Sequence, residues 1–501
     1  MFQWAEQSLN APFFFSIVSI FLVILLFKLS NRSTTATKLN LPPSPSKLPI
    51  IGNLHQLSSL PHRSLRSLAK KHGPVMLLHL GQSPTVVVSS ADAAREMFKT
   101  QDLNFSGRPR MRFQDKLDYS SMHLGFLPYG EYWRQVRKIC VLQLLTAQRV
   151  ESFKSVRAEE THLMIEKIRQ SCSSTSCVVD LSETIASLTR DIVCRAVLGR
   201  KFDKDAVINM KFDFVSGFDI GDFIPWLSWV NIITGFDAQM MKIFKALDEF
   251  LESVINDHIE SKKNSSDGVE DFVDVLLGLG KDSTGVTFGK PNIKAIIMDM
   301  FLAGSDTVST TIVWALTELI RHPEIMKEVQ KEIREIGKEN LSITEDDLGK
   351  MHYLKLVMKE TLRLHVPGPL LIPHESIQDT KLLGYDIPAK TRVLVNAWAI
   401  ATDPLLWEEP NEFRPKRFLN SSLDYKGNDF EYIPFGAGRR GCPGISFAIP
   451  TMELSLANLL FHFDWTLPNG EPRPEDLDIT EGFGIVTYKK DPLVVAATPY
   501  I

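Results

Sequence analysis

The sequence has little excess charge and few cysteines, and each shortage excludes a class of protein. Among 501 residues, 56 lysines and arginines face 60 aspartates and glutamates, a net charge of -4, so a nucleic-acid binder with a strongly basic surface is not expected. Five cysteines are too few and too unevenly spaced for a disulfide framework in this length, so we expect reduced thiols in a cytosolic compartment. Cys172 and Cys177 share the stretch "SCSSTSC", which we interpret as a surface loop. The alternative is a metal site, but the sequence supplies no further ligand pair at a suitable spacing.

One charge-free apolar run lies near the N-terminus. Ala11 to Phe27, "APFFFSIVSIFLVILLF", covers seventeen residues, or roughly 25 Å as a helix, which spans a bilayer if Lys28 reaches the interface. Glu6 precedes the run, whereas Lys28, Arg32 and Lys38 follow it. This asymmetry favours an uncleaved anchor with the remaining chain in the cytoplasm over a cleaved signal peptide.

The rest of the chain is expected to be mainly helical. After the anchor, "LPPSPSKLPIIGNLHQL" is rich in proline and favours extended, stiff backbone. Most segments from Pro61 to Lys281 show helical periodicity, interrupted by short β-like runs such as "PTVVVSS", Pro84 to Ser90. The sequence therefore predicts a mainly α fold with small sheets.

The longest expected helix runs from Pro291 to about Arg321, with His322 and Pro323 ending it. Its middle places the polar stretch Gly304 to Thr307 in an otherwise apolar helix. A glycine there costs about 1 kcal/mol relative to alanine, and a buried aspartate costs more unless it is paired. The defect indicates a functional site. The alternative is a polar patch satisfied by hydrogen bonds from serine and threonine to the preceding turn.

A second helix carries an acid and a base on one face. Glu360 and Arg363 in "YLKLVMKETLRLH" are three residues apart, and Arg417 in "FRPKRF" offers a further partner. The pair alone is equally compatible with an ordinary solvated salt bridge, which would contribute little to stability.

The most unusual stretch is "YIPFGAGRRGCPGISFAIP", Tyr432 to Pro450, in which glycines surround Cys442. Glycines let the backbone approach a flat cofactor and turn N–H groups toward the sulfur. Pro443 and Gly444 then lead into a helix whose N-terminal partial positive charge would also lower the pKa of the cysteine. A thiolate stabilised in this way is suited to ligate haem iron.

Together these motifs resemble a microsomal cytochrome P450. The family signature F-x-x-G-x-R-x-C-x-G is matched in every defined position by Phe435, Gly438, Arg440, Cys442 and Gly444. Three further sets of residues match motifs of the family. "AGSDT" matches its oxygen-activation motif, Glu360, Arg363 and Arg417 match its structural triad, and Trp133 with Arg137 matches its W-x-x-x-R pair. The similarity covers Pro42 to the C-terminus and is greatest to the plant A-type branch.

The resemblance implies the cytochrome P450 fold, mainly α with small β-sheets, with haem between the long central helix and the cysteine-loop helix. Within this fold we expect an N-terminal membrane anchor over residues 1–29, a linker and proline-rich hinge over 30–49, and a haem-thiolate catalytic domain over 50–501. The implied location is the endoplasmic reticulum membrane, with a single span and the catalytic domain facing the cytoplasm.

The resemblance also implies the haem contacts. Cys442 would be the axial ligand of the iron of haem b, and Arg440 and Arg137 would pair with the haem propionates. Trp133 would donate its indole N–H to the same group, unless it serves only helix packing. His374, in "LLIPHES", takes the position where relatives often place a propionate-binding arginine. The expected cofactor-binding residues are thus Cys442, Trp133, Arg137, His374, Phe435 and Arg440.

The implied activity is that of a monooxygenase. It would insert one atom of O2 into a lipophilic plant specialised metabolite, a terpenoid, alkaloid or phenolic, with electrons from NADPH delivered by a partner NADPH-cytochrome reductase. Asp306 and Thr307 would deliver protons as the catalytic pair, and Gly304 would leave room for O2. The alternatives are a haem-thiolate isomerase or dehydratase that needs no O2, and a non-catalytic haem-binding membrane protein. No nucleic-acid partner is expected.

Further expectations concern the pocket, the partner face and one proline. By family position, the pocket is lined by residues 110–124, 300–303, 366–371 and 482–486. A positive patch for the reductase, or else ordinary solvated charge, is formed by Arg134, Lys138 and Arg439. Pro450 falls inside the helix after Cys442 and should kink it or lie near its start.

Overall fold

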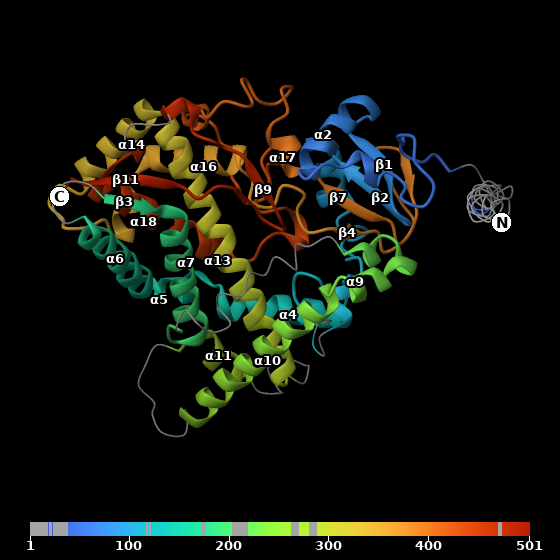
Figure 1. The fold of residues 1–501 in the computed structure, drawn as a ribbon, viewed down its shortest axis with the longest axis horizontal. Coiled ribbons are helices and arrows are strands. Elements are labelled where there is room, and N and C mark those ends of the chain that lie inside the picture. Colours follow the sequence, from blue (N-terminus) through green and yellow to red (C-terminus); the bar gives the residue numbers. More distant parts are fainter. Residues whose placement is uncertain are drawn as a thin grey trace, which may run out of the picture.

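The computed structural model describes residues 39–116, 119, 122–172, 177–202, 219–261, 270–279, 288–468 and 473–500, together with residues 19 and 23. The expected anchor, Ala11 to Phe27, lies almost wholly outside the described residues, and the expected boundaries at residues 29 and 49 stay predictions. Helices dominate the described chain and the sheets are small, as predicted (Figure 1).

The elements follow one another along the chain as below. The helices are α2 (Pro61–His72), α3 (Ala91–Arg95), α4 (Glu131–Ile139), α5 (Ala147–Ser152), α6 (Lys154–Ser171), α7 (Leu181–Leu198), α9 (Trp229–Ile233), α10 (Phe236–Ser261), α11 (Phe272–Gly278), α13 (Lys290–Arg321), α14 (Pro323–Ile336), α15 (Glu345–Leu348), α16 (His352–Leu364), α17 (Ala397–Ala401) and α18 (Ile445–His462). The strands are β1 (Val75–Leu80), β2 (Ser83–Val88), β3 (Cys177–Asp180), β4 (His374–Glu375), β5 (Thr380–Leu382), β6 (Tyr385–Ile387), β7 (Arg392–Val395), β8 (Phe463–Thr466), β9 (Glu481–Phe483), β10 (Thr487–Lys489) and β11 (Val494–Pro499).

The largest sheet has the strand order β1-β2-β7-β4, and smaller sheets are formed by β3-β11-β8, β5-β6 and β9-β10. β1 and β2 form an antiparallel hairpin in which Leu78 faces Thr85. The turn between them uses Gly81 at φ +61°, where a side chain would collide with the Phe223 carbonyl. β7 adds parallel to β2. Side chains on both faces of β7 are buried, which explains why the three residues after Arg392 are all apolar, without alternation.

The long helix α13 crosses the molecule through its core (Figure 1). It begins at Lys290 and ends at Arg321 with Pro291 in its first turn, so the predicted bounds are confirmed. Residues 308–320 are all buried, because α7, α16 and α18 pack around the helix. Among the described residues α13 is the one helix long and apolar enough to cross a membrane. Its packing makes it the core helix of the domain.

The helix after the cysteine loop, α18, is buried along most of its length and contains Pro450. Since α18 begins at Ile445, Pro450 stands in its second turn. A proline cannot donate the hydrogen bond that the sixth residue of a helix normally makes, so one bond of this second turn is missing. The second form of the expectation for this proline is confirmed.

The proline-rich segment before the domain packs against it. Pro42 and Pro45 are buried, and the Leu77 N–H donates to the Pro43 carbonyl at 2.9 Å. The segment is extended, as its composition predicts, and it covers β1, an edge strand with exposed hydrogen-bonding groups.

The cysteines correct one expectation. Cys172 and Cys177 were expected as reduced thiols, but they form a disulfide. Cys172 follows α6 and Cys177 begins β3, and their Cα atoms lie 4.8 Å apart, a separation that a disulfide can bridge. Cys140 and Cys194 are free and buried, whereas Cys442 is free and exposed.

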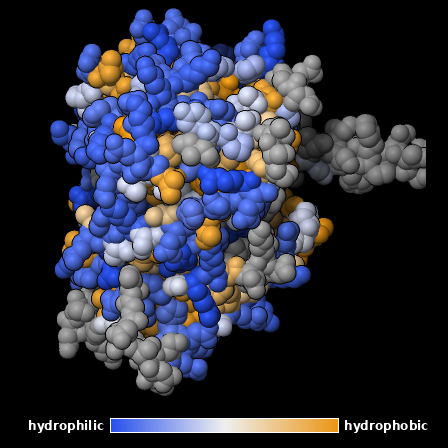
Figure 2. Space-filling model, turned by 90° about the vertical axis from the view of Figure 1, so that its left-hand side faces the viewer, coloured by the Kyte–Doolittle hydropathy of each residue, from blue (hydrophilic) through white to orange (hydrophobic). Residues whose placement is uncertain are grey.

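The molecular surface is uneven in its apolar content. The face drawn in Figure 2 is mostly hydrophilic, with apolar side chains scattered over it. Elsewhere, large apolar side chains that are more than half exposed gather on α9 and the short turn before it: Trp226, Trp229, Ile232 and Ile233. A contiguous group of this kind marks a surface that contacts something apolar.

Candidate active site

Cys442 is held in a tight loop before α18. Its N–H donates to the Phe435 carbonyl at 2.9 Å, and the Gly444 N–H donates to its sulfur at 3.3 Å. Gly438 has φ +65°, and a Cβ at this position would lie 2.6 Å from the Asp102 carboxylate. Only glycine fits this turn. As predicted, a backbone donor faces the sulfur.

The pKa of the Cys442 thiol differs from the expectation. Burial raises the pKa, and this effect exceeds the lowering by the Gly444 N–H and by the nearby Arg137 guanidinium. The residue nevertheless keeps exposed surface. The loop alone does not ionise this thiol. A bound metal ion would do so, because a coordinating thiol is deprotonated outright.

Three arginines lie beside the cysteine loop without counter-charges. Arg137 donates to the Gly441 carbonyl at 2.6 Å, and Arg440 and Arg108 donate to main-chain carbonyls of neighbouring loops. Within the described part of the chain none of these arginines forms an ion pair, and Nη1 of Arg440 is buried without a hydrogen-bond partner. The cluster has donors to spare and lacks an anion.

The electrostatics of the cluster fit the expected cofactor. Burial, followed by repulsion from Arg137, lowers the pKa of Arg440 to about 9. Burial also lowers the pKa of Arg108 well below its usual value, and burial together with Arg108 does the same to the pKa of His374. Buried positive charge without a counter-charge is costly. The carboxylates of haem propionates would supply the missing anions beside a thiol ligand, so these residues fit haem.

The aromatic residues of the expected haem site lie close to this cluster. The indole N–H of Trp133 donates to the Leu124 carbonyl at 3.3 Å, and the Arg440 guanidinium lies 4.2 Å over its ring. His374 hydrogen-bonds through Nδ1 to the Phe105 carbonyl at 2.8 Å. Trp133 is thus packed within the protein, as in the alternative that it serves helix packing, and it also supports Arg440 through a cation–π contact. Direct contacts of Trp133, His374 and Phe435 with haem stay predictions.

The polar stretch Gly304 to Thr307 of α13, here called the notch, forms some of its hydrogen bonds within the helix. Thr307 donates its hydroxyl to the Ala303 carbonyl at 2.7 Å, and Ser305 donates to the Phe301 carbonyl at 3.1 Å, which is the back-bonding of the alternative interpretation. Yet Ala303 and Asp306 are exposed in a helix that is buried from residue 308 onward. This single turn therefore borders open space and can meet a ligand.

Gly304 lets two core helices approach closely. A Cβ at Gly304 would lie 3.2 Å from Cγ2 of Val193 on α7, so a side chain at this position would crowd that helix. The expectation that Gly304 leaves room for O2 stays a prediction.

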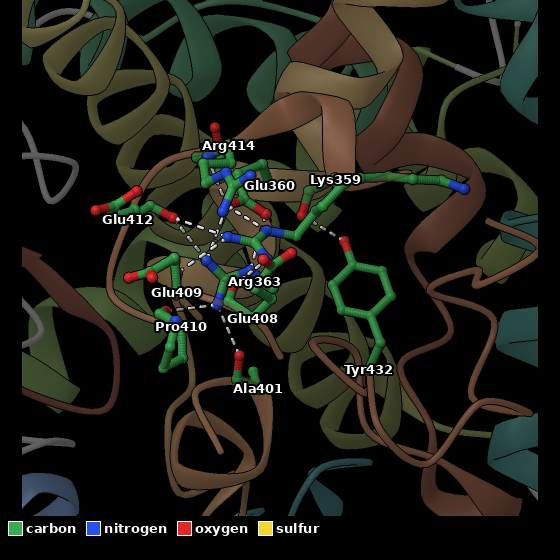
Figure 3. A network of polar contacts seen from close by, with 12 residues as sticks. Lys359, Glu360, Arg363, Ala401, Glu408, Glu409, Pro410, Glu412, Arg414 and Tyr432 are labelled. Carbon is green, nitrogen blue, oxygen red and sulfur yellow. Dashed lines mark hydrogen bonds and ion pairs between the residues drawn. The ribbon is translucent and has the colours of Figure 1, made fainter. Parts of the chain in front are cut away.

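The expected structural triad forms a buried network (Figure 3). Glu360 accepts both guanidinium bonds of Arg363 at 2.8 Å each and a further bond from Arg417 at 3.0 Å. The remaining donors of both arginines bind main-chain carbonyls of residues 401–412. Glu360 and Arg363 are fully buried, so the solvated salt bridge is excluded and the group fastens α16 to the end of α17 and the segment that follows it.

The segments expected to line the pocket partly converge. The Thr487 N–H donates to the Pro367 carbonyl at 2.8 Å, which joins the segment of residues 366–371 to the residue that directly follows the segment of residues 482–486. Cδ1 of Leu371 would lie 3.7 Å from a Cβ at Gly436 of the cysteine loop. The first of these segments therefore reaches from the β9-β10 hairpin to the cysteine loop.

Comparison with known proteins identifies the family. The family model described as "Cytochrome P450" matches residues 42–494. The chain belongs to the cytochrome P450 family. It is 50% identical to Cytochrome P450 736A117 of Prunus mume, over 99% of this chain and 97% of that protein. It is 50% identical to norfluorocurarine oxidase of a Strychnos species over 98% of both, and 48% identical to (+)-menthofuran synthase of Mentha piperita over 97% of this chain and 98% of that enzyme.

A solved structure confirms the P450 fold. A zebra fish cytochrome P450 with progesterone matches with a TM-score of 0.74 at 27% identity, covering 88% of this chain and 99% of that chain. P450s are monooxygenases that hold haem iron through a cysteine thiolate and take electrons from a redox partner. This P450 and its plant relatives share that enzyme class.

Two residues near the P450 site were missed by the sequence analysis. Arg108 lies in "GRPRMRF", where nothing distinguishes the arginine that turns inward. Asp299 lies four residues before Ala303 and therefore on the same side of α13, and this spacing was the available signal. It binds His123 and Leu124, at the end of a segment expected to line the pocket.

Proposed function

We propose that this P450 is an NADPH- and O2-dependent monooxygenase that hydroxylates or otherwise oxidises a lipophilic plant specialised metabolite. The observation that carries the proposal is the exposed Cys442 thiol beside the buried Arg108 and the half-buried Arg137 and Arg440, which lack counter-charges in the described structure. The names of two relatives, norfluorocurarine oxidase and (+)-menthofuran synthase, support oxidation of such metabolites. Terpenoids, alkaloids and phenolics are the first substrates to screen.

The chain's own residues would hold haem b in a defined way. The sulfur of Cys442 would ligate the iron, and Arg137, Arg440 and Arg108 would bind the propionates. When bound, the haem supplies the activation of oxygen. Asp306 and Thr307 of α13 would deliver protons as the catalytic pair. Because the Thr307 hydroxyl donates to the Ala303 carbonyl, its oxygen keeps lone pairs that can hold a water molecule, to which the Asp306 carboxyl can pass a proton.

We also propose a cytoplasm-facing enzyme on the endoplasmic reticulum membrane, served by an NADPH-cytochrome reductase. The apolar N-terminal run supports the anchor, and the exposed tryptophans and isoleucines of α9 support contact of the domain with lipid. For the reductase, Arg134 and Lys138 remain exposed. Arg439 is bound to Asp102 at 2.6 Å and to the Tyr129 hydroxyl at 2.9 Å, so it contributes less to a docking patch.

The test uses the full chain in membranes with reductase and NADPH. First, carbon monoxide is added to the reduced protein, and the red-shifted absorption of a thiolate-ligated haem is expected from the native chain and is expected to be lost in Cys442→Ala. A panel of lipophilic plant metabolites is then incubated under isotopically heavy O2. One heavy oxygen atom per product supports the proposal. Product formed without O2 would indicate the isomerase or dehydratase, and a thiolate spectrum with no NADPH consumption on any substrate would indicate the non-catalytic protein.

A further inference from the structure

Four consecutive carbonyls near the site each accept a hydrogen bond from a different side chain. They belong to residues 124–127, and their donors are Trp133, Arg108, Gln114 and Arg440, in that order, at 3.3, 2.9, 3.3 and 2.7 Å. We call residues 122–127 the carbonyl loop. Arg108 and Arg440 belong to the arginine cluster, and Trp133 lies against Arg440, so the position of the carbonyl loop influences the position of groups that fit haem.

One carboxylate of α13 binds two consecutive residues of the carbonyl loop. Asp299 accepts the Leu124 N–H at 2.6 Å through one oxygen and contacts Nδ1 of His123 at 3.0 Å through the other. The Asp299 side chain is 16% exposed and the His123 side chain 4%. Hydrogen bonds to a carboxylate are strong, and they gain further when water is excluded. Leu124 therefore connects Asp299, through its N–H, with Trp133, through its carbonyl.

The same side of α13 makes a second contact two turns earlier. Asn292 donates to the Tyr132 hydroxyl of α4 at 2.5 Å and to the sulfur of Met122 at 3.5 Å; Figure 1 shows α4 beside the N-terminal part of α13. In the other direction, the spacing of four residues places Ala303 and Thr307 on the side of the helix that carries Asp299. One side of α13 thus carries Ala303, Thr307 of the notch, Asp299, and the contact with α4.

We propose that Asp299 is a positioning residue, which couples the notch of α13 to the haem-binding arginines through the carbonyl loop. By fixing His123 and Leu124, it holds the loop whose carbonyls orient Arg108, Trp133 and Arg440 toward the propionates. It also fixes the end of the segment expected to line the substrate pocket. This inference rests on the proposed haem function and adds a residue to its machinery.

The test compares two substitutions at Asp299 with a matched acid on the other side of α13. Asp299→Leu removes both contacts. Asp299→Asn keeps an acceptor for the Leu124 N–H and can donate to His123, so it should rescue most of the effect. Asp248 of α10 binds Lys294 of α13 at 2.7 Å and makes no contact with the carbonyl loop in the described structure. Asp248→Leu is therefore the control.

Three readouts separate positioning from general stability. In the haem-loaded Asp299→Leu enzyme, hydrogen–deuterium exchange of residues 122–127 should rise, and transfer of haem to apomyoglobin should accelerate by about tenfold or more, the loss expected for a charge-assisted hydrogen bond. Product formed per NADPH should fall, while the thiolate absorption with carbon monoxide keeps its position. Asp248→Leu should match the native enzyme in all three.

The outcomes are distinct from those of the proposed function. If the native chain shows no thiolate absorption, the haem function itself fails. If the native chain shows it and Asp299→Leu equals Asp248→Leu in exchange and haem release, only the positioning role is refuted. Should Asp299→Leu not fold, His123→Leu decides. Faster exchange of residues 122–127 and faster haem release in that variant support the proposal, and native values overturn it.

Discussion

At the scale of single residues, the site contains groups whose charged forms are disfavoured by their surroundings. Burial raises the pKa of Cys442 and lowers the pKa of Arg440. The thiolate and the guanidinium are each costly without a partner, but iron beside the sulfur and a propionate beside the guanidinium would relieve both costs at once. A ligand that binds only the folded chain also stabilises it by mass action. Haem binding is therefore expected to be coupled to the stability of the whole domain.

Thr307 gives the sharpest residue-scale prediction. Thr307→Ala removes the hydroxyl oxygen that can hold water at the notch, while the helix hydrogen bonds of its backbone remain. We expect the haem spectrum to persist, peroxide to increase, and the rate of product formation to fall by about a hundredfold, the lower range for a positioned proton donor. Thr307→Ser keeps the hydroxyl and serves as the control. Product per NADPH equal to that of the native enzyme would remove Thr307 from the mechanism.

At the scale of elements, two local signals made the site predictable. Prolines at the start and after the end of α13 fixed its bounds, and the spacing of Glu360 and Arg363 placed both on one face of α16. The carbonyl loop could not be predicted, because its partners come from four separate segments and from α13, and no local pattern records such contacts. The raised pKa of Cys442 was missed for the same reason, since burial is a property of the assembled fold.

The Glu360 network predicts how α16 is held. Glu360→Gln leaves Arg363 and Arg417 buried with one formal negative charge fewer, and breaking a buried pair in this way costs about 3–5 kcal/mol. We expect the free energy of unfolding in urea to fall by this amount, together with the yield of haem-loaded protein. Lys416→Gln is the control, because Lys416 lies in the same turn as Arg417 but forms an exposed pair with Glu328, whose loss should cost less than about 1 kcal/mol. Equal effects of the two variants would contradict the structural role.

At the scale of the whole molecule, residues far apart in the sequence close the domain. β11 near the C-terminus pairs with β3, which begins at Cys177. The β9 strand is joined to α2 through Glu481, which accepts from Arg63 at 2.7 Å and contacts His62 at 3.2 Å. No local pattern in the sequence indicates which of these segments pair. The pairing is set by the shared core, in which each partner covers apolar surface that the other leaves open.

The Glu481 contact predicts a dependence of stability on pH. Burial alone would raise the pKa of Glu481, but hydrogen bonds from His62 and Arg63 outweigh it and lower the pKa to about 2. In the unfolded chain the value is about 4.3. A group whose folded pKa is depressed stabilises the fold above the unfolded pKa and loses this contribution as pH falls toward the folded pKa. Because the Glu481 side chain is only 4% exposed, the contribution at neutral pH is on the order of 3 kcal/mol.

The measurement is the difference in the free energy of unfolding between the native enzyme and Glu481→Gln. We expect this difference to be largest at pH 7, to decrease below about pH 4.3, and to approach zero near pH 2. Glu475→Gln provides the control, because Glu475 pairs with Arg473 at an exposed site and should show little difference at any pH. A difference that stays constant between pH 7 and pH 3 would mean that Glu481 does not titrate with the fold. The stability of the contact between α2 and β9 would then depend on packing and not on the charge of Glu481.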